Sequence, residues 1–80
     1  MDEIREKIKV GAVFEGAAVK PKWFFWSGRK ILVQRVTYTW RSREGESRLT
    51  HFSVTDGTTL FELCLNQQSL EWQLVKMETS

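Results

Sequence analysis

Basic side chains alternate with aromatic ones along the middle of this chain of 80 residues. Residues 20–48 hold eight Lys or Arg against two Glu, a net charge of +6 within a total of +2. The stretch from Trp23 to Trp40 also holds six of the ten aromatic side chains. Rings that stack on bases, beside cations that follow phosphates, are typical of grooves that bind single-stranded nucleic acid. The candidate binding residues are Lys22, Trp23, Phe25, Arg29, Lys30, Arg35, Arg41, Arg43 and Arg48.

The aromatic part of this candidate surface has two interpretations. Trp23 and Phe25 fall on the face of a hairpin opposite to Phe24 and Ile31, so both faces of that hairpin are apolar. A second layer, such as a strand over Ile8–Phe14, covers the spare face, or the face is an exposed binding platform. We favour the covered face, because aromatic side chains in small domains usually pack.

The arginines also have two interpretations. Arg35, Arg41 and Arg43 are expected on the outer face of the third and fourth strands, among Thr and Ser side chains. Charges there either protect the sheet from edge-to-edge association or form an anion-binding surface. Edge protection is the commoner role.

A catalytic site has little support. The only histidine, His51, is expected opposite Glu62 on the outer face, where a cross-strand polar pair is commoner than a general base. No serine or cysteine is placed beside it, since Cys64 lies diagonal to His51 and is expected to be a partly buried, small apolar side chain. The sequence contains no Gly-rich phosphate loop, paired carboxylates or metal-ligand cluster. We therefore predict a non-enzymatic protein with no catalytic residues, cofactor or metal site.

Composition indicates one ordinary folded domain over residues 1–80, since 41% of the residues are hydrophobic and 28% are charged. A single cysteine cannot form an internal disulfide, which favours a reducing compartment. No apolar run approaches the ~18 residues of a membrane span, and the charged start is unlike a signal peptide. These features predict a cytoplasmic protein without a membrane partner.

Turn signals recur at the short spacing of an antiparallel meander. Ser27-Gly28 predicts a two-residue hairpin loop, and Asp56-Gly57 predicts a type I′ turn. A three-residue loop over 43–45 or 44–46 and a four-residue loop over 66–69 complete the series. Before them we expect a strand over Lys7–Glu15, with residues 1–6 frayed or forming a short helical lead-in.

The predicted loops place one set of apolar side chains on a single buried face. Phe52 falls opposite Phe61, and Leu63 falls opposite Trp72. The odd-length loop adds to this face Val36, Tyr38 and Trp40. Along the third strand the core-facing apolar side chains are expected at odd-numbered positions up to Val33 and at even-numbered positions from Val36 onward. This change from odd to even positions predicts a β-bulge near Gln34-Arg35. We therefore predict an all-β fold, an antiparallel meander of five or six strands curled into a small barrel or a two-layered sheet.

A longer pattern spans Pro21 to Met77. It reads Pro21-x-x-Phe24-x-Trp26-x-Gly28-Arg29, then Val33, Trp40, His51-Phe52-Ser53-Val54 and Trp72-x-Leu74. The pattern resembles a family of small uncharacterised bacterial all-β domains, some of which look attached to DNA-repair polymerase-type proteins. The resemblance implies a compact β unit. Its shared positions are mostly core aromatics and turn glycines, and it supplies no catalytic residues.

Together these observations predict a small binding module for single-stranded nucleic acid. The alternative is a protein-interaction or homodimerisation domain that uses an unpaired edge strand or the spare aromatic face. A small-molecule barrel is disfavoured, because so short a chain encloses little interior space.

Overall fold

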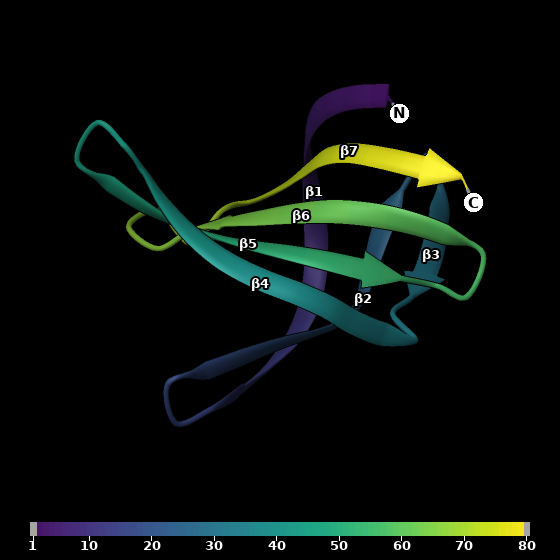
Figure 1. Cartoon of the computed structure of the whole chain (residues 1–80), viewed down its shortest axis with the longest axis horizontal. Coiled ribbons are helices and arrows are strands. Elements are labelled where there is room, and N and C mark those ends of the chain that lie inside the picture. The colour runs from purple at the N-terminus through teal and green to yellow at the C-terminus, as the bar shows by residue number, and fades with distance from the viewer. Residues whose placement is uncertain (1, 80) are drawn as a thin grey trace.

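The computed structural model describes residues 2–79 (Figure 1). Within these residues the chain forms seven β-strands and no helix. Every neighbouring pair of strands is antiparallel, in the order β3-β2-β1-β7-β6-β5-β4. The all-β antiparallel meander is therefore confirmed. The strands are β1 (Asp2–Glu15), β2 (Ala18–Trp26), β3 (Arg29–Leu32), β4 (Arg35–Glu44), β5 (Ser47–Thr55), β6 (Thr59–Asn66) and β7 (Trp72–Thr79).

The predicted number of strands is wrong, and the sheet does not close into a barrel. Where we expected one long third strand with a bulge, the chain breaks at Val33-Gln34 into β3 and β4. The backbone N–H of Val33 donates to the carbonyl of Lys22, whereas that of Gln34 donates to the carbonyl of Thr55. Because these two bonds go to different strands, β3 and β4 become the two separate edges of the sheet.

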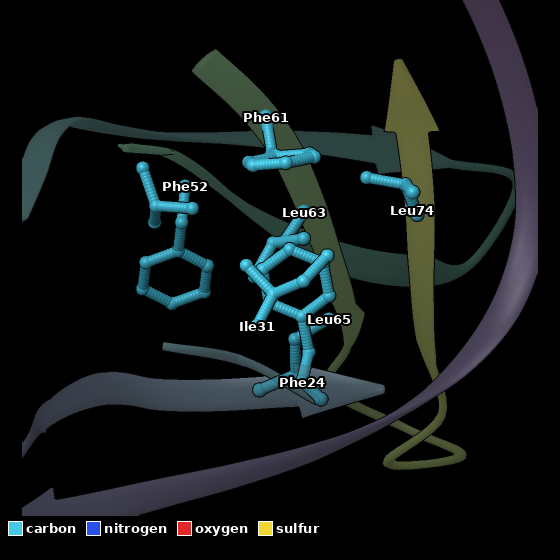
Figure 2. Close-up of a cluster of buried hydrophobic side chains, with 8 residues drawn as sticks. Phe24, Ile31, Phe52, Phe61, Leu63, Leu65 and Leu74 are labelled. Atoms are coloured by element: carbon cyan, nitrogen blue, oxygen red, sulfur yellow. The ribbon is translucent and has the colours of Figure 1, made fainter. Parts of the chain in front are cut away.

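The core lies inside the curl of the sheet. Phe24 of β2 and Ile31 of β3 are buried against side chains from β5, β6 and β7 (Figure 2). That second group consists of Phe52, Val54, Phe61, Leu63, Leu65 and Leu74. Trp72 packs against this cluster, as its predicted inward position requires. Burying such apolar surface is the main favourable term that holds so small a domain together.

β1 joins the two parts of the curl, because it pairs with β2 on one side and β7 on the other. Its strand conformation includes the predicted range Lys7–Glu15 and begins already at Asp2. Residues 2–6 therefore continue the strand in place of the frayed or helical lead-in that we considered, and Met1 lies outside the described residues.

The Ser27-Gly28 hairpin has the predicted register. Both residues have positive φ, 54° and 75°, as a two-residue type I′ loop requires. Phe24 therefore pairs with Ile31, and Trp23 pairs with Leu32.

The two later loops are longer than predicted, because polar side chains organise them. The Asp56 carboxylate accepts backbone N–H bonds from Thr58 and Thr59, and the Asn66 side-chain oxygen accepts two from Gln68 and Ser69. Both registers consequently move by two residues. Phe52 lies opposite Leu63 where Phe61 was predicted, Val54 opposite Phe61, and Trp72 opposite Leu65. A shift of two leaves the side chains near these loops on their predicted faces. A bulge between Glu62 and Leu63 adds one more residue further along β7, where Phe61 pairs with Met77 in place of the predicted Leu74.

The β4–β5 turn corrects the prediction most strongly. Its loop is Gly45-Glu46, between the paired residues Glu44 and Ser47, so its length is even where an odd length was predicted. One residue of difference moves a strand's side chains to the other face. Tyr38 and Trp40 therefore lie on the outer face, and Tyr38 is 67% exposed. Their predicted core positions are wrong.

The same turn brings the β4 arginines inward. Arg41 pairs with the buried Thr50 and Arg43 pairs with Arg48, on the side of the sheet where Thr39 faces Phe52. The predicted outer-face position of Arg41 and Arg43 is therefore wrong. A bulge between Val36 and Tyr38 lets Val36 keep its predicted place against the core.

Asp56 should make part of the stability pH-dependent. The hydrogen bonds donated by the backbone N–H groups of Thr58 and Thr59 hold the pKa of its carboxyl below the ordinary value. The contribution is therefore present above the ordinary pKa and is lost as the pH falls through the lowered one. We expect Asp56→Ala to lower the free energy of unfolding by about 1 kcal/mol at neutral pH.

The difference between the two proteins should begin to shrink below about pH 4, where the carboxyl of the unfolded chain becomes protonated, and it should be lost once the pH falls below the lowered pKa of the folded protein. Urea unfolding of both proteins at neutral and acidic pH measures this. A difference that stays constant on acidification would contradict the assigned role of the carboxylate.

Candidate nucleic-acid interface

A groove of about 790 Å³ lies between two hairpin arms. One arm is formed by β1 and β2, the other by β4 and β5, and the arms diverge at the left of Figure 1. We call this space the arm groove. Its principal lining residues are Phe14 and Val19 on the first arm, with Arg41, Arg43, Arg48 and Thr50 on the second.

Three arginines of the arm groove are close in register and have no carboxylate partner. Arg43 lies directly opposite Arg48 across the β4–β5 ladder, and Arg41 lies two residues before Arg43 on the same face. Within residues 2–79, none of the three forms an ion pair. Like charges directly opposite each other destabilise a sheet, so this arrangement concentrates positive charge at some cost.

A polar floor and an aromatic rim complete the arm groove. Thr50 is buried, and its hydroxyl accepts a hydrogen bond of 2.7 Å from the Gln67 side chain. On the opposite arm Phe14 is 62% exposed. The sequence analysis considered Phe14 only as the end of a covering strand over Ile8–Phe14, in which it alternates in phase with Ile8 and Val10. Alternation shows which face of a strand a side chain shares, but not that Phe14 lies beyond the part of β1 that the core covers.

A second, smaller cleft of about 420 Å³ follows the arm groove along β4. It lies between the first half of β2 and the start of β4, and we call it the edge cleft. Lys22 and Arg35 line it together with Val19, Val33 and Val36.

The nine predicted binding residues therefore divide among three places. Arg41, Arg43 and Arg48 line the arm groove. Lys22 and Arg35 line the edge cleft. The remaining four residues lie on the β2–β3 hairpin and line neither space; they are Trp23, Phe25, Arg29 and Lys30.

Trp23 packs against neighbouring residues of its own sheet. Its indole lies directly over Gly11 of β1, and the Lys30 ammonium lies 4.9 Å from the ring centroid. Phe25 contacts it edge-on at 5.4 Å and is itself 42% exposed. The expected second layer over this face is absent from the described residues, since Leu32 is also 64% exposed.

Gly11 leaves the space that Trp23 occupies, which gives a test by double-mutant cycle. A Cβ at position 11 would overlap ring atoms of Trp23, so the indole would have to move. We expect Gly11→Ala to lower the free energy of unfolding by about 1–3 kcal/mol, against the ordinary preference of strands for Ala. In a Trp23→Ala background the same change should cost little. Equal costs in both backgrounds, measured by urea unfolding, would exclude the contact.

A row of aromatic and polar side chains crosses the outer face. Trp40 stacks between Tyr38 and His51, with centroid distances of 5.6 and 5.0 Å. Ser42 Oγ lies 2.7 Å from His51 Nε2, so the expectation that no serine accompanies the histidine is wrong. The two-residue shift also places Cys64 directly opposite His51, with Glu62 diagonal to it.

Ser42, His51 and Glu62 follow one another in this row. His51 Nδ1 lies 3.4 Å from Glu62 Oε2 without forming a hydrogen bond to it, so the carboxylate contact on the imidazole is looser than the serine contact. Glu62 also lies 3.5 Å from the Lys76 ammonium. Cys64 is buried where only partial burial was predicted, and burial, followed by the charge of Glu62, raises the pKa of its thiol.

Comparison with protein families, curated proteins and solved structures yields no match for this chain. Across residues 2–79 there is no helix long and apolar enough to cross a membrane.

Proposed function

We propose that the protein is a non-enzymatic module that binds single-stranded nucleic acid in the arm groove. Arg41, Arg43 and Arg48 contact phosphates, and Phe14 stacks on a base. The observation that carries the proposal is the direct pairing of Arg43 with Arg48, without a carboxylate, inside a groove.

The charge arrangement supports an anionic ligand more than edge protection. A solvated edge is protected equally well by charges that point away from each other. Here three guanidinium groups line one space, although Glu44 and Glu46 lie in the adjoining turn region and form no ion pair with them. A polyanion in the groove would relieve their repulsion, and it would release counterions when it binds.

The exposed ring of Phe14 supports a single strand more than a duplex. Bases within a duplex are stacked on each other, so an isolated ring beside phosphate-binding arginines has access only to unpaired bases. The arms of the groove come from different hairpins, and a flexible strand can follow the space between them.

Fluorescence polarisation of a labelled single-stranded oligonucleotide of about 15 nucleotides tests the proposal. Intrinsic tryptophan fluorescence is less suitable, because no tryptophan lines the arm groove. We expect saturable binding, with a slope of about −2 for log affinity against log salt from three phosphate contacts. A matched duplex should bind more weakly. Absence of binding at low salt, or binding that salt does not change, would refute the proposal.

Phe14→Ala should weaken oligonucleotide binding by about tenfold, because stacking contributes about 1–3 kcal/mol per base. The fold should keep its stability, since the Phe14 ring is largely exposed. Val13→Ala is the matched control, because Val13 is the adjacent residue, 44% exposed, and does not line the groove. Equal effects of the two substitutions on affinity would remove Phe14 from the site.

A further inference from the structure

Two stretches of unpaired strand edge flank the edge cleft. Within residues 2–79 β4 pairs only with β5, so its other edge has no strand partner there from Arg35 to Glu44. β2 pairs with β3 only from Trp23 onward, which leaves the preceding residues 18–21 free on that side. Unpaired edges carry backbone N–H and C=O groups that readily accept another strand. Residues from both stretches line the edge cleft.

Side chains around the edge cleft define what such a strand should contain. Val19, Val33 and Val36 are half-buried and form an apolar floor. Lys22 and Arg35 are exposed at its rims, and within residues 2–79 neither forms an ion pair. Every charged residue that lines this cleft in the described part of the chain is basic.

We propose that the edge cleft captures an extended acidic segment of another protein, which adds to the free edge of β4. Successive side chains of a strand point to opposite sides, so a segment with alternating apolar and acidic residues fits best. Its apolar side chains contact the valine floor, and its carboxylates reach Lys22 and Arg35. Five residues of β4, 35–39, offer a pairing length of about 17 Å.

A second copy of this chain fits the same edge poorly. β4 carries Arg35, Arg41 and Arg43, and its only acidic residue is Glu44 at the end. Two such edges paired with each other would bring these cations together, which is unfavourable. Charge therefore favours an acidic partner over the homodimer.

This proposal can be tested independently of nucleic-acid binding, because the edge cleft shares only Val19 with the arm groove. The probe is a terminally blocked peptide of about eight residues in which glutamate and valine alternate. It is titrated into the full chain by calorimetry and by NMR of the labelled protein. We expect saturable binding and at least about tenfold slower exchange of those amides in residues 35–39 that point away from β5, as new strand pairing requires.

Three controls separate strand addition from general charge attraction. Methylation of alternate peptide nitrogens removes the ladder donors but keeps the charge, and it should abolish binding. The corresponding lysine–valine peptide should not bind. Arg35→Glu should weaken binding by about tenfold or more, whereas Arg29→Glu, outside the cleft, should leave it within about twofold.

Several outcomes would overturn the proposal. These are failure of the acidic peptide to bind, undiminished binding of the methylated peptide, and unchanged exchange in residues 35–39. Sedimentation that shows a stable dimer protected at those same amides would assign the edge to a second copy instead. Loss of oligonucleotide binding in Arg43→Glu with retained peptide binding would show that the two sites are separate.

Discussion

Phe24→Ala should lower the free energy of unfolding by about 3–5 kcal/mol, which is much of the total stability of so small a domain. The Phe24 side chain has no exposed surface, and its ring lies 5.1 Å from that of Phe61 in an edge-on contact. Phe24 belongs to β2 and Phe61 to β6, so this contact holds the two parts of the curled sheet together. Urea unfolding followed by tryptophan fluorescence measures the loss.

Phe25→Ala is the matched control for this prediction. Phe25 is the next residue of β2, lies on the opposite face and is 42% exposed. Its removal should cost about 1 kcal/mol or less, because surface side chains contribute little. If the two substitutions destabilised the protein equally, the curled arrangement with Phe24 inside would be wrong.

Arg43→Glu should weaken binding of the single-stranded oligonucleotide by at least about tenfold, since it removes one phosphate contact and adds repulsion. The free protein should become slightly more stable, by about 0.2–1 kcal/mol, because the new carboxylate would lie opposite Arg48. Arg43→Glu should therefore weaken oligonucleotide binding while it raises the free energy of unfolding. A residue whose only role is to stabilise the fold would not show this combination.

Arg29→Glu carries the same change of charge to a residue outside the arm groove. Its effect on affinity should be small at moderate salt, where distant charges are screened. Equal losses for Arg29→Glu and Arg43→Glu would mean that net charge alone governs binding. Polarisation measurements at a fixed salt concentration decide between the two results.

Local signals in the sequence predicted much of the fold. Alternation of apolar residues and the turn glycines identified the antiparallel meander, and Ser27-Gly28 gave the correct register. The loop lengths predicted from turn residues were two residues too short at Asp56 and Asn66. The side chains of these residues accept backbone hydrogen bonds, which stabilise the longer loops. The extra edge strand arises where two backbone bonds near Val33 diverge, and nothing in the local composition marks that point.

The candidate site was predicted only in part. Its arginines were identified by type, yet Arg41 and Arg43 were assigned to the wrong face, because one residue in the 44–46 turn decides which side they occupy. The arm groove itself depends on how two hairpins diverge, and no spacing along the chain encodes that distance. Phe14 was missed because alternation shows which side chains share a face, not how far along a strand the core extends.

The most direct test of the nucleic-acid interface is NMR mapping of the labelled protein during titration with the single-stranded oligonucleotide. Binding in the arm groove predicts that amide shifts concentrate in residues 14–19 of one arm and 41–50 of the other. They should diminish together in Arg43→Glu. Shifts confined to residues 23–32, the hairpin of Trp23 and Phe25, or no shifts at saturating oligonucleotide, would contradict it.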